Sequence, residues 1–150
     1  QTCALPISNI TEACLLTGTP YKTSYDESYI HELLKKLLAL GCHTAALTGV
    51  SYEKGRLGVV SLDRNGDTFS YFTRHCPQSY HGTGDLYSST VLGGLMRGLS
   101  LGNALSLAAD FVVACIEATA SAENARWYAV EFESQIPLLC EMLDQRLKNN

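Results

Sequence analysis

The segment HGTGDLYSSTVLGGLMRGLSL, residues 81–101, places a glycine-rich turn directly before an apolar stretch that predicts a helix. Gly82 and Gly84 allow close backbone approach to a ligand, and the N–H groups and dipole of the following helix would suit an anion. Asp85 could accept a proton from an attacking hydroxyl while N–H groups at Gly82, Thr83 and Gly84 hold a transferring phosphoryl group. Spacing alone favours an ordinary turn, in which Thr83 caps the helix and Asp85 stabilises its dipole.

Helices are expected on both sides of this segment. Ser24 and Glu27 have the spacing of a capping box, with leucines at helical intervals after them and Gly41 just past the end. Ser100 is expected to cap another helix, whose apolar stripe runs to Ile116. The remaining predicted helices cover residues 9–16, 83–97 and 131–148.

Strands are predicted over 44–48, 57–62 and 68–73, the last two joined by Asn65-Gly66, a strong hairpin signal. This order predicts an α/β fold with helices layered on a sheet. Three strands cannot easily cover five helices. We therefore expect the sheet to be incomplete and to continue one begun by sequence that is absent here.

Composition limits the classes of function. The 150 residues suit one domain, with 46% apolar and 17% charged residues and a net charge of −4, so nucleic acid is not expected as a partner. The six cysteines show no zinc spacing, and no uninterrupted apolar run reaches the roughly 18 residues of a membrane span. Without a signal-peptide pattern, we expect a cytoplasmic protein and no membrane partner.

Residues 1–8, QTCALPIS, can be back-translated into a common sequencing-library adapter. We interpret them as a non-native leader, with residues 9–150 as the protein proper. Recovering the gene with an unrelated library chemistry would test this, and finding the same eight codons would refute it.

Two further patterns concern phosphate chemistry. Asn9-Ile10-Thr11-Glu12 opens the first predicted helix, and Thr48 ends the first predicted strand. Asn9 and Glu12 fit an ordinary helix start, and Thr48 could simply finish a strand. Ligands of open α/β sheets, however, bind outside the carboxyl ends of strands, where Thr48 would lie.

Taken in order, these patterns resemble those of the ribokinase-like kinases. Sugar kinases of that superfamily usually show Gly-Ala-Gly-Asp, and hydroxymethylpyrimidine kinases usually carry Cys in place of the Asp. The form Gly-Thr-Gly-Asp, followed by Leu and an aromatic residue, resembles pyridoxal kinases. SYHGTGD (79–85) and WYAVEFE (127–133) are similar to the pyridoxamine-kinase branch of Gram-positive bacteria.

The resemblance implies that residues 9–150 form the C-terminal, ATP-side half of a three-layer α/β/α sandwich. Asp85 would be the catalytic base, and Gly82, Thr83 and Gly84 the anion hole. Thr48 would contact ATP phosphate, while Asn9 and Glu12 would organise Mg²⁺, typically through water.

The reaction implied is ATP-dependent phosphorylation of the 5′-hydroxymethyl group of pyridoxal, pyridoxine or pyridoxamine, by a parent protein that is a homodimer. The fragment alone is expected to be inactive, because the vitamin-side pocket belongs to the other half. Alternatives are a hydroxymethylpyrimidine or sugar kinase, a non-catalytic nucleotide-binding relative, and an inert truncated product.

Overall fold

The computed structural model describes residues 5–78, 80–122 and 129–149. The chain divides into two compact units, Gln1–Phe72 and Thr73–Asn150, and each is described by itself.

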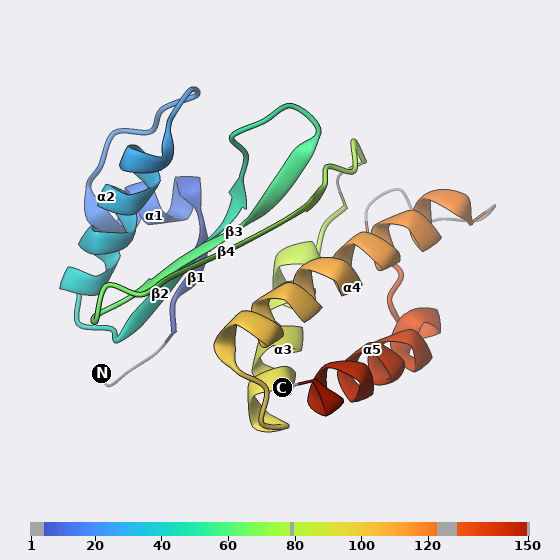
Figure 1. Cartoon of the computed structure of the whole chain (residues 1–150). Coiled ribbons are helices and arrows are strands. Elements are labelled where there is room, and N and C mark those ends of the chain that lie inside the picture. Colours follow the sequence, from blue (N-terminus) through green and yellow to red (C-terminus); the bar gives the residue numbers. More distant parts are fainter. Residues whose placement is uncertain (1–4, 79, 123–128, 150) are drawn as a thin grey trace. The chain divides into compact units, whose positions relative to one another are not determined.

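A four-stranded mixed sheet organises the first unit, with strand order β1-β2-β3-β4 (Figure 1). β1 runs parallel to β2, whereas β2 and β3 are antiparallel. Gly66 has a φ of 92° in the turn that follows β3, so the predicted Asn-Gly hairpin is confirmed. The strands are β1 (Ile7–Asn9), β2 (Thr44–Val50), β3 (Arg56–Asp63) and β4 (Thr68–Arg74), whose last two residues belong to the second unit.

β1 was not expected as a strand of its own. It contains Ile7 and Ser8, which were assigned to the proposed leader, and Ile7 pairs with Ala46 of β2. The Ser8 side chain is buried, and its hydroxyl has no hydrogen-bond partner among the described residues. The polar atom is therefore held in the sheet without the compensation that buried hydroxyls usually find.

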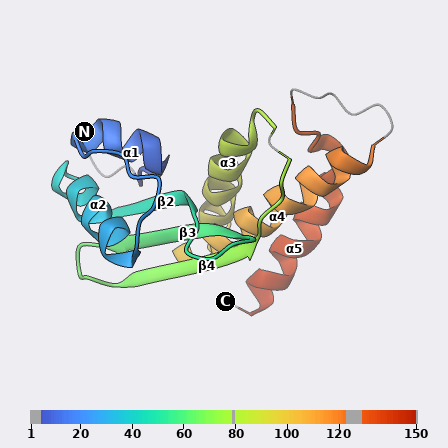
Figure 2. The same ribbon diagram turned by 90° about the horizontal axis from the view of Figure 1, so that it is seen from above.

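Two helices, α1 (Ile10–Thr17) and α2 (Glu27–Ala39), cover the same face of this sheet (Figures 1 and 2). α2 buries one stripe against β2 and β3, as its helical spacing predicts. The core between helices and sheet includes Ile10, Ala13, Ile30, Leu33, Leu34, Leu37, Leu47, Val50 and Leu62.

The predicted capping box at Ser24 and Glu27 is wrong. The N-cap of α2 is Asp26, whose Oδ1 accepts hydrogen bonds from the backbone N–H of Tyr29 (3.0 Å) and from the Ser28 hydroxyl (2.7 Å). Because the Asp26 carboxylate accepts two hydrogen bonds, the helix is capped two residues later than at the predicted Ser24. These hydrogen bonds also lower the pKa of Asp26.

The second unit is helical, with α3 (Thr83–Met96), α4 (Leu101–Ser121), a 3₁₀ turn η1 (Glu133–Gln135) and α5 (Ile136–Lys148). A Cβ on Gly94 of α3 would lie 3.3 Å from the Cβ of Ala104 in α4, so the small residue does permit close packing. Ser100 caps α4, as predicted. The last helix begins at Ile136 rather than near residue 131, and Pro137 occupies its first turn, where a proline is tolerated.

α4 is long and apolar enough, by length and composition alone, to match a membrane span. Core helices of soluble proteins pass the same test, so this is weak evidence. One side of α4, including Leu105, Phe111 and Cys115, is fully buried in the unit, and Asp110 pairs with Arg146 of α5. These contacts explain the apolar stripe as a packing surface. The α/β class predicted from the sequence is confirmed.

Candidate phosphate-binding and catalytic site

Asn9 and Glu12 cap the start of α1, because each side chain accepts a hydrogen bond from the backbone N–H of the other residue. The Asn9 Oδ1 accepts a hydrogen bond from the Glu12 backbone N–H at 2.8 Å, and the Glu12 Oε2 accepts one from the Asn9 N–H at 3.0 Å. The capping box weighed as the ordinary interpretation is therefore present. Both side chains are nevertheless exposed, and no described residue donates a hydrogen bond to the Glu12 Oε1.

Thr48 lies beside this helix start. Its register partner in β1 is Asn9, so the first unit brings Asn9, Glu12 and Thr48 together at the carboxyl ends of two neighbouring parallel strands. The β2–β3 ladder shifts register between Thr48 and Val50, where Gly49 adopts a φ of 73°. This break ends the regular ladder immediately after Thr48, in the position that ligands of α/β sheets use.

The residues of this corner fit a magnesium ion held mainly by a nucleotide and by water. Glu12 offers one exposed carboxylate, and the described residues contain no group of three or more His, Cys, Asp or Glu side chains that could hold a metal. Mg²⁺ at nucleotides usually keeps several waters and takes only one or two protein carboxylates. A lone carboxylate is thus compatible with that donor set and not with an all-protein cage.

In the second unit, the glycine turn opens α3. Gly82 is the N-cap, with a φ of 88° and no side chain to form a cap hydrogen bond. The interpretation of Thr83 as the cap is wrong, because Thr83 is the first helical residue and its hydroxyl donates to the Tyr80 carbonyl at 3.3 Å. The first-turn N–H groups of α3 therefore receive no side-chain acceptor, which suits an anion.

A contact distant in the sequence supports this turn. The Val130 N–H donates to the His81 carbonyl at 3.2 Å, and a Cβ on Gly82 would lie 3.9 Å from the Val130 Cγ1. Val130 belongs to a buried cluster with Phe111 and Cys115. Burial raises the pKa of the Cys115 thiol to about 11, so this cysteine stays neutral. Nothing in the local sequence indicated that Val130 supports the turn.

Asp85 lies in the first turn of α3 and is exposed. It forms no ion pair with any described residue, so its carboxylate is available to a ligand. In the second unit the structure thus brings together Gly82, Thr83, Gly84 and Asp85. A Cβ at Gly84 would meet no atom within 4 Å, so the space beside this backbone is open.

A groove of about 600 Å³ lies elsewhere in the first unit, between α2 and the β3–β4 hairpin. Its lining includes Glu27, His31 and Lys35 of α2 together with Tyr52 and Phe72. None of the predicted site residues contributes to it. Its lining therefore offers none of the groups that the sequence predicts to handle phosphate.

Each of these two arrangements lies at the N-terminus of a helix, and one also lies at a strand end, which are positions where α/β proteins often bind phosphate. The sequence model of the family described as phosphomethylpyrimidine kinase matches residues 1–128. The chain belongs to this family of kinases.

Solved structures agree with that membership. A protein described as a putative phosphomethylpyrimidine kinase from Bacteroides thetaiotaomicron, crystallised with pyridoxal, is 27% identical with a TM-score of 0.77, over 91% of this chain and 48% of that one. Pyridoxal kinase from Lactobacillus plantarum is 29% identical with a TM-score of 0.75, over 93% and 49%. Pyridoxal kinase from Staphylococcus aureus, in complex with ADP, shares the fold at 19% identity with a TM-score of 0.70, over 84% and 45%.

The chain thus spans about half the length of these relatives. No curated protein matches it significantly.

Proposed function

We propose that the chain is the ATP-side half of a kinase that phosphorylates the 5′-hydroxymethyl group of a B6 vitamer. The observation that carries this proposal is the exposed Asp85 carboxylate beside first-turn N–H groups that Gly82 leaves without a side-chain acceptor. A general base next to a cradle of donors is the minimum that phosphoryl transfer requires of a protein.

In this proposal Asp85 accepts the proton of the acceptor hydroxyl. The N–H groups at Gly82, Thr83 and Gly84 stabilise the negative charge of the transferring phosphoryl group. Thr48 contacts the ATP phosphates, and Asn9 and Glu12 orient the water shell of Mg²⁺. When bound, Mg²⁺ would neutralise part of the phosphate charge.

A B6 vitamer is favoured as the acceptor by the names of two relatives. One is called pyridoxal kinase, and the other was crystallised with pyridoxal. Structures of the Staphylococcus aureus pyridoxal kinase with AMP-PCP, and with AMP-PCP plus pyridoxal, support the pairing of an ATP analogue with this vitamin. Asp85 in place of the Cys usual in hydroxymethylpyrimidine kinases points the same way.

The second candidate is a hydroxymethylpyrimidine kinase, because the matching family is described by that chemistry. Both acceptors carry a primary hydroxyl on a heteroaromatic ring, so the ATP-side residues would serve either one. The complete protein, assayed with pyridoxal, pyridoxine, pyridoxamine, hydroxymethylpyrimidine and a sugar, separates the candidates by relative kcat/KM.

Asp85→Asn in the complete protein tests the mechanism. Turnover should fall by about 10² to 10⁴, as for loss of a general base, while ATP affinity stays near that of the parent. Asp144→Asn, on the exposed side of α5 in the same unit, is the matched control and should leave turnover unchanged. An Asp85→Asn enzyme with nearly full turnover would remove Asp85 from this role.

A further inference from the structure

The segment that follows β2 is not held by the sheet alone. The register shift at Gly49 interrupts the β2–β3 ladder directly after Thr48, and β2 ends at Val50. The next N–H group, that of Ser51, donates instead to the hydroxyl of Tyr25 at 3.1 Å. Tyr25 lies 26 residues earlier, in the loop between α1 and α2, so this hydrogen bond fixes the exit of β2 from outside the ladder.

Tyr25 is itself placed by a row of aromatic rings. Its ring stacks on Tyr29 of α2, with centroids 6.0 Å apart and planes 28° apart. Tyr52 meets the Tyr25 ring edge-on, with centroids 6.4 Å apart, and the Tyr52 and Phe72 rings have centroids 5.6 Å apart. Tilted and edge-on pairs of this kind favour a defined ring orientation. The Tyr25 hydroxyl is therefore presented to Ser51 in a fixed direction.

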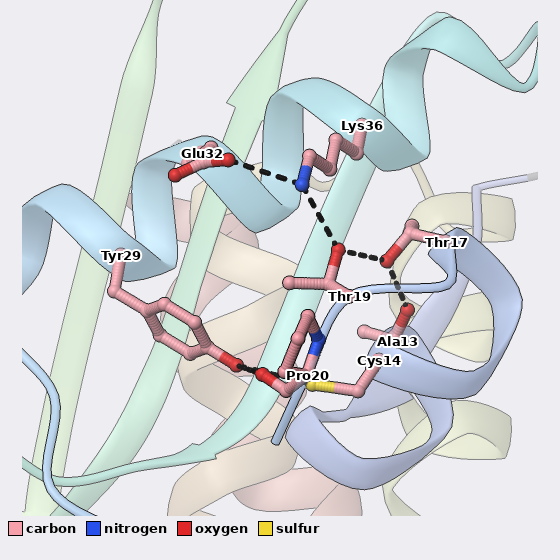
Figure 3. A network of polar contacts seen from close by, with 8 residues as sticks. All are labelled: Ala13, Cys14, Thr17, Thr19, Pro20, Tyr29, Glu32 and Lys36. Atoms are coloured by element: carbon pink, nitrogen blue, oxygen red, sulfur yellow. Dashed lines mark hydrogen bonds and ion pairs between the residues drawn. The ribbon is translucent and has the colours of Figure 1, made fainter. Parts of the chain in front are cut away.

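The far end of the row is anchored in the core. The Tyr29 hydroxyl donates to the Pro20 carbonyl at 2.7 Å and lies 3.2 Å from the Cys14 Sγ, and the Tyr29 side chain is buried (Figure 3). The same loop is tied a second time, because the Lys36 ammonium donates to the Thr19 hydroxyl at 3.2 Å. The loop that carries Tyr25 is thus held by hydrogen bonds at Thr19 and Pro20, which precede the tyrosine in the sequence.

We propose that Tyr25 is a positioning residue for the phosphate-contacting end of β2: its hydroxyl fixes Ser51 and thereby the last residues of the strand, which include Thr48 and Gly49. This inference rests on the proposed contact between Thr48 and ATP phosphate. Tyr25 acts through the backbone and touches no substrate. Its loss should weaken nucleotide binding while leaving the hydrophobic core of the unit intact.

The test compares Tyr25→Phe with Tyr52→Phe in the complete protein. Both changes remove one hydroxyl and keep the ring in the same aromatic row, but only the Tyr25 hydroxyl has a hydrogen-bond partner among the described residues. Amide exchange of Ser51, followed by NMR, reports the hydrogen bond directly. Calorimetric titration with MgATP reports nucleotide affinity, and urea unfolding reports stability.

In Tyr25→Phe, Ser51 exchange should accelerate about fivefold or more, as expected for loss of one ordinary hydrogen bond. The Kd for MgATP should rise about threefold to tenfold, without a comparable change in Tyr52→Phe. Unchanged Ser51 exchange, or faster exchange with unchanged affinity, would overturn the inference while leaving the proposed function standing. If the unsubstituted protein did not bind MgATP although the Ser51 amide was still protected from exchange, the proposed function would be overturned, and the role of Tyr25 with it.

Discussion

Glu12→Gln separates the capping role that the structure shows for this side chain from the magnesium role that we propose for it. Glu12 completes the capping box of α1 through its Oε2, and it is the proposed carboxylate for Mg²⁺. Glutamine keeps an oxygen that can accept the hydrogen bond from the Asn9 N–H. It loses only the negative charge at the helix N-terminus.

The stability effect of this change should be small. A charge at an exposed helix N-terminus is worth about 0.3–1 kcal/mol, so the free energy of unfolding should fall by less than about 1 kcal/mol. Asn9→Ala removes the cap acceptor itself and should cost about 1 kcal/mol, within a range of about 0.5–2 kcal/mol. The exposed position of Glu12 gives no reason for a larger loss.

The effect on nucleotide should be larger than the effect on folding. Residues that hold a metal through an outer shell typically contribute about 10- to 100-fold to its affinity, so MgATP should bind at least about tenfold more weakly to Glu12→Gln. When EDTA removes Mg²⁺, the affinity for ATP should be the same in the unsubstituted protein and in Glu12→Gln. Calorimetric titration with and without Mg²⁺, beside urea unfolding, measures both quantities.

The reasoning would be refuted by a Glu12→Gln chain that binds MgATP as tightly as the parent. A loss of affinity that is equal with and without Mg²⁺ would also refute it, because the charge would then act on ATP and not on the metal. Either result would remove Glu12 from the magnesium site, and the first would leave it as a capping residue alone.

Three further changes test the packing of the first unit. Gly58→Ala should lower the free energy of unfolding by about 2 kcal/mol or more in urea, because its Cβ would lie 2.2 Å from the Tyr71 carbonyl oxygen, and an unchanged midpoint would contradict this contact. Ser8→Ala removes a buried hydroxyl without a described partner, so the melting temperature should rise by an amount equivalent to about 1 kcal/mol; a fall would indicate a hidden partner. Burial, with the neighbouring Cys14, raises the pKa of Tyr29 to about 12 from its usual value near 10, so the unfolded chain releases this proton first as pH rises. Stability should therefore decline between about pH 10 and pH 12, and Tyr29→Phe should flatten that decline in pH-dependent urea unfolding; an equally steep decline would refute the assignment.

Local patterns in the sequence predicted most of the elements that frame the site. The Asn9–Glu12 box, the Ser100 cap and the Asn65-Gly66 turn each depend on neighbours within a few residues, and all are found in the structure. The start of α2 was misassigned although its signal is also local. Ser24 and Asp26 are both good caps, and spacing alone does not show that Asp26 gains a second donor from Ser28.

The support of the site could not be predicted, because it depends on contacts between distant residues. Val130 holds the Gly82 turn across 48 residues of chain, and Tyr25 reaches Ser51 across 26. Neither contact has a periodicity or a short spacing that would reveal it. Trp127 and Tyr128, which contribute to the resemblance to pyridoxamine kinases, lie outside the described residues.

The two glycines of the proposed anion-binding turn are under different constraints. Gly82 has a positive φ that side chains rarely adopt, so even an alanine there would strain the backbone in an empty protein. Gly84 lies in ordinary helical geometry with open space around it, and an alanine would be limited only by a ligand. Consider a library that contains all substitutions at both positions and is selected first for folding and then for activity. Variants substituted at position 82 should be lost at the first selection, and variants substituted at position 84 only at the second. The residue tolerance at position 84 would then measure how closely the phosphate approaches the chain.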